Sequence, residues 1–76
     1  MKRVLVFFND ESVTTLTVLS GVKTIRRQYP NGKEIYLEIL TARFPTLTGT
    51  RVVYVASDRE LTSEEIFAAS ENSNRH

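Results

Sequence analysis

The four residues Tyr29-Pro30-Asn31-Gly32 divide the first half of the chain into two segments with different hydrophobic periods. Proline cannot continue a helix, and glycine readily adopts the positive φ angle that closes one. Before this break, residues 17–29 place apolar side chains at intervals of three and four: Val18, Leu19, Val22, Ile25 and Tyr29. This spacing predicts an amphipathic helix with one buried stripe.

After the break, the hydrophobic period changes to two. Ile35, Leu37 and Ile39 alternate with other residues between positions 33 and 40, which predicts a strand. Residues 4–8 form a continuous apolar run, which predicts a strand that is covered on both faces in the interior of a sheet. Residues 51–56 predict a third strand.

Residues 13–19 allow two interpretations, because many of them are β-branched and weaken a helix. In the first, the helix begins near Glu11 or Ser12, with Asn9 and Asp10 as capping residues. In the second, residues 13–19 form a strand that pairs with the first strand through a turn at residues 9–12. We favour the helix because residues 22–28 separate into an apolar and a polar side only with a helical period.

Residues 41–50 are predicted to be a loop, with Pro45 and Gly49 as breakers and with the apolar side chains of Phe44 and Leu47 inside it. Thr62 or Ser63 is predicted to cap a last helix, which has acidic residues in its first turn.

The predicted order is therefore β-α-β-β-α, a small two-layer α+β sandwich. Residues 1–69 form its single domain, and residues 70–76 form a flexible polar tail. A right-handed first crossover makes the first two strands parallel. The alternative fold is an antiparallel β-meander with a C-terminal helix.

Groups that carry catalysis are scarce in this sequence. There is no cysteine, and the only histidine is His76, the last residue. The adjacent carboxylates Asp10-Glu11 and Glu64-Glu65 point about 100° apart on a helix, so neither pair shares a site. We therefore expect no enzymatic activity, no cofactor and no metal site. No segment approaches the roughly 20 apolar residues of a membrane span, so we expect a cytoplasmic protein.

One face of the predicted sheet is more apolar than a small domain leaves exposed. Alternate residues of each strand share a face, and one of the two faces gathers Leu5, Phe7, Tyr36, Leu40, Val52 and Tyr54. Such an aromatic face is not left bare in water. The last helix, through Ile66 and Phe67, is one candidate cover. The others are a protein partner, which includes a second copy, and single-stranded RNA.

The small size and the surplus apolar face predict a non-enzymatic binding or regulatory protein that docks on another macromolecule. A small accessory or inhibitory protein of a mobile element has this profile. The partner is another protein or a second copy in a homodimer. The predicted partner-binding residues are Phe7, Tyr36, Tyr54, Phe44 and Leu47.

The alternative is a nucleic-acid-binding module. Residues 1–33 hold six Lys and Arg against two Asp and Glu, although the net charge of the chain is only +1. One polar side of the predicted helix offers a basic surface for phosphates, made by Lys23, Arg26, Arg27 and nearby Lys33. A second mode stacks RNA bases on Phe7, Tyr36 and Tyr54, with Arg3 and Arg51 at the rim.

Overall fold

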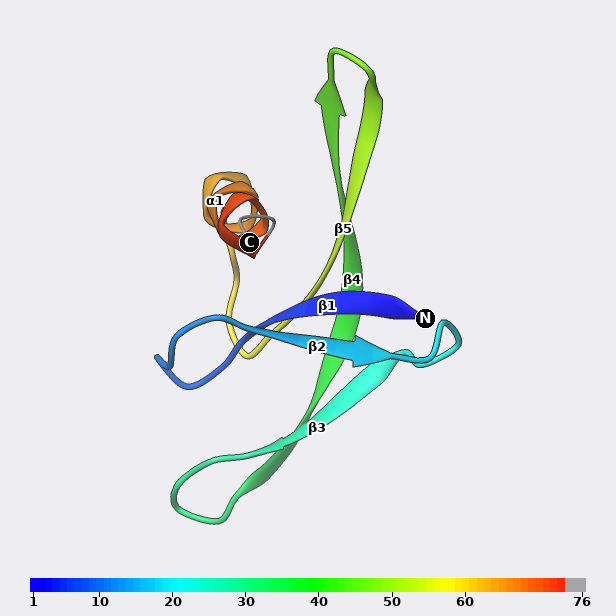
Figure 1. Cartoon of the computed structure of the whole chain (residues 1–76). Coiled ribbons are helices and arrows are strands. Elements are labelled where there is room, and N and C mark those ends of the chain that lie inside the picture. The colour runs from blue at the N-terminus through cyan, green and yellow to red at the C-terminus, as the bar shows by residue number, and fades with distance from the viewer. Residues whose placement is uncertain (74–76) are drawn as a thin grey trace.

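The structure, a computed structural model, describes residues 1–73, with the side chains of residues 1–71. Its elements are β1 (Lys2–Phe7), β2 (Thr14–Val18), β3 (Thr24–Gln28), β4 (Glu34–Thr46), β5 (Gly49–Ser57) and α1 (Ser63–Ser73). The strands form one strongly curled sheet in the order β2-β1-β5-β4-β3, and α1 lies beside it (Figure 1). The fold is mostly β and belongs broadly to the α+β class. All neighbouring strands are antiparallel except β1 and β5.

The predicted helix at residues 17–29 is wrong, and the predicted order β-α-β-β-α is wrong with it. This segment contains the end of β2, a turn and β3. The alternative interpretation of residues 13–19 is confirmed, because β2 pairs antiparallel with β1 and places Leu16 opposite Val4. The β-branched residues of β2 determine the outcome, since they pack well on a pleated surface and poorly in a helix. The parallel pairing joins β1 to β5, not the first two predicted strands.

The turn between β1 and β2 explains why these strands fold back on each other. Asn9 and Asp10 adopt left-handed φ angles of 52° and 56°. The N–H of Glu11 donates to the carbonyl oxygen of Phe8 at 3.0 Å. Asn and Asp tolerate this conformation better than other residues with side chains. The two residues therefore make a tight turn and do not cap a helix.

Two other predictions for this part of the sheet are confirmed. β1 lies between β2 and β5, and its residues 4–7 are buried. The break at residues 29–32 is a turn, in which the N–H of Gly32 donates to the carbonyl oxygen of Tyr29 at 2.9 Å. Gly32 has a φ of 90°, which favours glycine.

The sheet has a separate apolar core on each face. The inner face curls until side chains from strands at opposite ends of the sheet pack together: Val4, Val6, Phe8, Ile25, Leu37 and Ala56. On the outer face, α1 covers β1 and β5, with the buried residues Leu5, Phe7, Val53, Val55 and Ile66. Curling therefore covers one face, and the helix covers part of the other.

The predicted loop at residues 41–50 is wrong. β4 continues to Thr46, and a two-residue turn leads directly to Gly49 at the start of β5. The N–H of Ile39 donates to the carbonyl oxygen of Lys23, so odd-numbered residues of β4 direct their N–H toward the β3 side. Pro45 is odd-numbered, so its missing N–H would point to the β3 side of β4. β3 pairs with β4 only up to Glu38, so the proline removes no hydrogen bond of the sheet.

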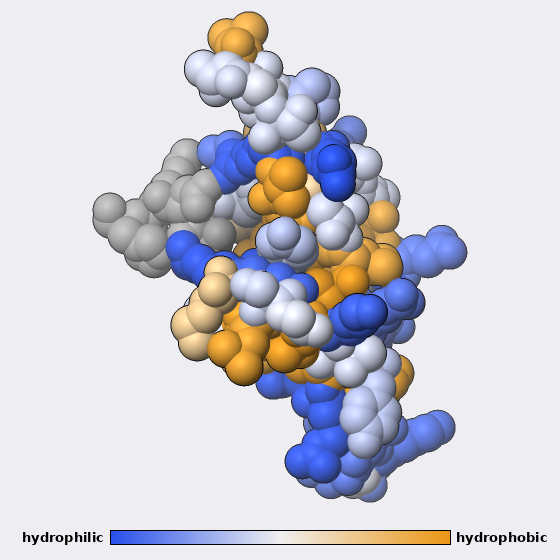
Figure 2. Space-filling model, turned by 90° about the vertical axis from the view of Figure 1, so that its right-hand side faces the viewer, coloured by the Kyte–Doolittle hydropathy of each residue, from blue (hydrophilic) through white to orange (hydrophobic). Residues whose placement is uncertain are grey.

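Residues 42–53 form what we call the distal ribbon, the part of β4 and β5 that extends beyond their other partners. β3 pairs with β4 only up to Glu38, and β1 pairs with β5 only from Tyr54 onward. The ribbon projects from the rest of the sheet (Figure 1) and gives the molecule its longest dimension, 44 Å against 26 and 25 Å. Figure 2 shows hydrophobic atoms at the far end of the projection, separated by polar groups from the larger hydrophobic area of the body.

The last helix begins as predicted. Thr62 accepts a hydrogen bond from the N–H of Glu65 at 3.1 Å, and the N–H of Thr62 donates to the Glu65 carboxylate at 3.4 Å. This reciprocal pair is a capping box. α1 continues through Ser73, past the predicted start of the tail at residue 70, whereas residues 74–76 lie outside the described part. No helix in the described chain is both long and apolar enough to cross a membrane.

Candidate functional site

An apolar strip follows the outer face of β4, beside the area that α1 covers. It consists of Tyr36, Leu40 and Phe44 on β4 and Phe67 on α1, and we call it the β4 strip. Tyr36 is 67% exposed and Leu40 is 56% exposed. Even-numbered residues of β4 share this face, so Tyr36 and Phe44 lie in line about 26 Å apart at the rise of a strand. The helix therefore leaves Tyr36 and Leu40 uncovered, with the exposed Glu38 between them on the same face.

The two ends of the β4 strip differ in how their aromatic side chains are packed. The rings of Phe44 and Phe67 meet edge to face, with centroids 5.6 Å apart and an angle of 69° between the planes. This geometry is favourable for aromatic pairs. At the other end, Tyr36 lies opposite Arg26 of β3, which forms a long surface ion pair with Glu34 at 3.9 Å. Leu40 therefore lies between a packed aromatic pair, Phe44 and Phe67, and an exposed tyrosine, Tyr36.

A groove of about 350 Å³ opens beside Leu40, between the sheet and the segment that leads into α1. Its apolar lining is Leu40, Val55, Leu61 and Ile66, and its polar lining is Ser57, Arg59 and Glu60. An apolar centre with a polar rim is the usual anatomy of a protein interface. The groove can accept an apolar side chain of a partner next to the β4 strip.

The structure separates the five residues predicted to bind a partner. Tyr36 and Phe44 belong to the β4 strip, and Leu47 is fully exposed at the tip of the distal ribbon. Phe7 is buried in the outer core, with the Arg59 guanidinium 6.0 Å from the centre of its ring. Tyr54 packs against the inner core, and the ammonium of Lys2 lies 5.1 Å from the centre of its ring.

The predicted aromatic platform of Phe7, Tyr36 and Tyr54 is therefore wrong. The parallel register pairs Val4 with Tyr54 and Leu5 with Val55. This register puts Tyr54 on the inner face and Phe7 on the outer face. The last helix was one of the three candidate covers of the apolar face, and it does cover Phe7 through Ile66. It does not cover Tyr36 or Leu40.

The basic surface predicted on a helix is also wrong, because its residues lie on or beside β3. Arg26 and Arg27 are neighbours in a strand and point to opposite faces. The guanidinium of Arg27 lies 5.5 Å from the centre of the Phe8 ring. Lys23 and Lys33 lie beyond opposite ends of the strand. The four cations are thus dispersed.

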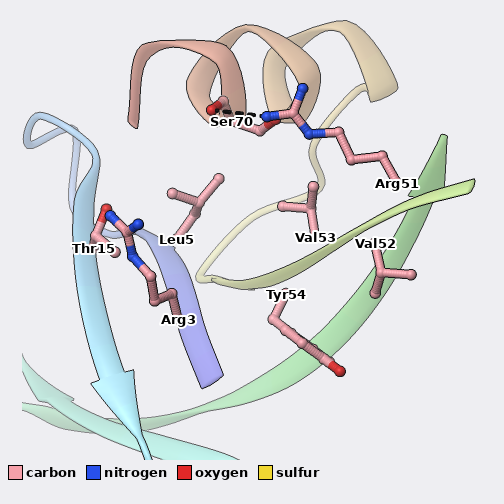
Figure 3. Close-up of a pocket in the computed structure, with 8 residues that line it drawn as sticks. All are labelled: Arg3, Leu5, Thr15, Arg51, Val52, Val53, Tyr54 and Ser70. Atoms are coloured by element: carbon pink, nitrogen blue, oxygen red, sulfur yellow. Dashed lines mark hydrogen bonds between the residues drawn. The ribbon is translucent and has the colours of Figure 1, made fainter. Parts of the chain in front are cut away.

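A second groove, of about 250 Å³, lies where β1 and β5 separate (Figure 3). Leu5 and Val53 point from the sheet toward α1, whereas Val52 and Tyr54 point to the opposite face. Arg3 and Arg51 lie on the two sides of the groove, so the arginines expected at the rim of a platform instead border this opening. Sequence reasoning missed the groove, because it depends on where the parallel pairing of β1 and β5 begins.

Asp58 holds together the ends of three strands at the opposite end of the sheet from the ribbon. Its Oδ2 accepts hydrogen bonds from the Asn9 N–H at 3.0 Å and from the Tyr29 hydroxyl at 3.1 Å. Burial raises the pKa of Tyr29, and the hydrogen bond to the Asp58 carboxylate and its negative charge raise it further. The Tyr29 ring also packs on Phe8, with centroids 4.6 Å apart. We call Asp58 with these two partners the Asp58 latch.

Within the described residues, no group of three or more His, Cys, Asp or Glu side chains is arranged to hold a metal ion. The candidate sites described above are grooves and an exposed apolar strip.

Comparison with known proteins gives one family. The sequence profile of the YnfN protein family matches residues 26–72, which run from β3 into α1. The chain is similar to the Uncharacterized protein YnfN of Escherichia coli (strain K12), with 53% identity over 45 residues. These cover 58% of this chain and 88% of the relative. No solved structure matches the chain significantly.

Proposed function

The chain belongs to the YnfN protein family, and we propose that it is a non-enzymatic binding protein that docks on another protein through the β4 strip. The exposure of Tyr36 and Leu40 beside an apolar groove is the observation that carries this proposal. All four residues of the strip lie within residues 26–72, so the strip lies wholly within the segment that matches the family.

A protein partner suits this surface better than a small molecule does. The strip is long and shallow, and it combines two aromatic anchors with an aliphatic side chain between them. Aromatic residues in the centre of an interface contribute most of its binding energy, and the polar rim excludes water around them. A partner that places one apolar side chain in the groove beside Leu61 would cover Leu40, which lines the groove.

We infer a regulatory or inhibitory role in the cytoplasm, of the kind that small accessory proteins of mobile elements perform. The support is the size of the chain, 76 residues, and a composition without cysteine and with one histidine at its end. A protein of this kind acts by occupying a surface of its partner. A second copy of the chain is one partner that the strip can accept.

Photo-crosslinking tests the proposal. We expect p-benzoylphenylalanine at Tyr36 to give a discrete crosslinked product in the native host, because this side chain is exposed on the strip. The same group at Ser20, which is exposed between β2 and β3, is the matched control. Leu40→Glu should abolish the product at Tyr36, whereas Lys33→Glu should not. A product of equal yield at both positions would contradict the proposal, and a product of twice the mass of the chain would identify a homodimer.

A nucleic-acid-binding function has less support, since the four cations predicted for it do not share one surface. Arg26 is engaged with Glu34, and Arg27 lies against the Phe8 ring. Retention on heparin at low salt that is lost in Lys23→Glu/Arg27→Glu would restore this alternative.

A further inference from the structure

We propose that the free edge of β5 in the distal ribbon is a site that accepts an extended, acidic peptide as an added strand. This site lies at the second groove, on the side of α1 away from Leu40, and it goes beyond docking through the β4 strip.

The first observation is the length of the β1–β5 ladder. It runs from the Val4–Tyr54 pair to the Phe7–Ser57 pair, whereas β5 begins at Gly49. Residues 49–53 of β5 therefore pair with β4 alone among the described strands. Five residues of a strand offer an edge of about 17 Å, which is long enough for a short peptide to pair with.

The direction of the backbone groups identifies which residues are available. The N–H of Asp58 donates to the carbonyl oxygen of Phe7 at 3.3 Å, so even-numbered residues of β5 direct their backbone groups toward the β1 side. Thr50 and Val52 follow the same alternation. Their N–H and C=O groups therefore point toward the opening where β1 no longer runs beside β5.

The second observation is the groove that occupies this opening. It has a volume of about 250 Å³, and its apolar floor is formed by Leu5 and Val53 (Figure 3). Arg3 and Thr15 border one side, and Ser70 of α1 borders the other. An added strand would thus pair with Val52 and place alternate side chains on an apolar floor, which is how strand addition combines affinity with specificity.

The third observation is the charge around the groove. Arg51 donates to the Glu71 carboxylate at 2.6 Å and to the carbonyl oxygen of Ser70 at 3.4 Å, which ties it to α1. Arg3 makes no ion pair within the described part of the chain. Arg43 lies directly opposite Val52 in the ribbon, and Lys2 is the fourth cation.

Arg3 and Arg51 thus line the groove, and Arg43 and Lys2 lie on the other face of the sheet near Val52 and Tyr54, with Glu71 as the one acid among these contacts. A carboxylate on the added strand would pair with Arg3, and such charge-assisted hydrogen bonds are about twice as strong as neutral ones. The same cations would repel a basic peptide, so charge selects an acidic segment.

The two edges of the distal ribbon differ in a way that supports the choice of β5. On the β4 edge, Pro45 removes one of the outward N–H groups, a common means by which proteins prevent strand addition. On the β5 edge, residues 49–53 contain no proline. One edge is protected and the other is left able to pair.

A peptide fits the site better than a nucleic acid does. The alternating N–H and C=O groups of Thr50 and Val52 match the spacing of another peptide backbone. Tyr54, the nearest aromatic residue, is half-buried and has Lys2 over its ring, so it does not offer a free face for a base. An oligonucleotide is nevertheless a necessary comparison in the experiment.

The experiment is a titration of the ¹⁵N-labelled full chain with a degenerate peptide library, followed by NMR. Alternate positions of the library are Glu or Asp, and the others are an equal mixture of Val, Ile, Thr, Phe and Tyr. We expect the amide signals of Thr50 and Val52 to shift, together with that of Arg3. A library with Lys and Arg in place of the acids, and an oligothymidylate, should leave these signals unchanged.

Two variants and one modified library separate strand addition from simple charge attraction. Arg3→Glu should weaken binding at least about tenfold, whereas Arg26→Glu, an equal charge change on β3, should not. Val52→Pro removes an outward N–H without removing a bond to β4, and it should also abolish binding while the circular dichroism spectrum is retained. An acidic library that is N-methylated at alternate residues should not bind.

Each opposite result overturns the proposal. Equal binding of the N-methylated library would exclude backbone pairing, and shifts caused by the oligothymidylate alone would assign the site to nucleic acid. Absence of any shift with the acidic library at low salt would exclude the site altogether. None of these results bears on crosslinking at Tyr36, so the docking proposal can fail or hold independently.

Discussion

β4 and β5 run through two regions of the molecule, and the same two strands have different roles in them. In the body of the sheet, each has partners on both sides, and Leu37 and Val55 are buried. In the distal ribbon, they pair only with each other, and Val52 and Leu47 are exposed. Stability therefore concentrates in the body, where apolar area is removed from water, and surfaces that are free to bind concentrate beside and beyond it.

Leu37 gives the most direct test of whether stability is concentrated in the body of the sheet, because its side chain is only 2% exposed and lies in the inner core. Leu37→Ala should lower the free energy of unfolding by about 2–5 kcal/mol, because it leaves a cavity between strands that the curl holds together. Urea denaturation followed by circular dichroism would measure the change. A loss below about 1 kcal/mol would show that the inner core is not tightly packed.

The Asp58 latch should give the next largest effect. Asp58→Ala leaves the Asn9 N–H without its partner and should cost about 1–3 kcal/mol of stability in the same measurement. Asp58→Asn is the matched control, since its amide oxygen can still accept both hydrogen bonds, and it should cost less. Equal losses in the two variants would mean that the charge, and not the hydrogen bonds, is what matters.

Alkaline pH should weaken the same latch. The pKa of Tyr29 is raised above its ordinary value of 10.0, first by burial and then by Asp58. Because the folded pKa lies above the unfolded one, the stabilisation is fully present below about pH 10 and is lost as the pH rises through the folded pKa. Urea denaturation across this range should show a smaller alkaline loss in Tyr29→Phe. Parallel curves for the two proteins would contradict this.

The smallest effect is expected at the tip of the distal ribbon. Leu47→Ala makes the same chemical change as Leu37→Ala, but the Leu47 side chain is fully exposed. The free energy of unfolding should therefore change by less than about 0.5 kcal/mol. A larger loss would mean that the tip packs against something in solution, and a dependence of that loss on protein concentration would identify a second copy.

Local chemistry in the sequence predicts several elements correctly. The apolar run of β1, the alternation in β4, the strand at residues 51–56 and the capping box before α1 are each signalled by neighbouring residues. The segment at residues 17–29 fails for a physical reason. Val18, Ile25 and Tyr29 all contact the inner core, but they come from two strands and the turns beside them. Their spacing imitates a helical stripe only because a turn separates them.

The candidate site could be predicted only in part. Tyr36 and Phe44 were both predicted to bind a partner, but Phe44 was predicted to lie in a loop. The structure places both on one face by alternation along a single strand. Phe7 was assigned to that face correctly, but α1 buries it there. Tyr54 was assigned to that face wrongly, because β5 is apolar at both alternations and gives no sign of its register with β1. The second groove depends on that register as well. Pro45 was interpreted as a breaker inside a loop at residues 41–50, since only the position of β3 shows that its edge is free.

The parallel pairing of β1 with β5 also sets the order in which the molecule is assembled. Every other pair of strands is adjacent in sequence and can form as a hairpin, whereas Val4 must meet Tyr54 across most of the chain. Closing such a distant contact is slow compared with forming hairpins. During synthesis, β1 therefore cannot pair with β5 until β5 has left the ribosome, and until then its apolar side chains lack the cover that this pairing provides.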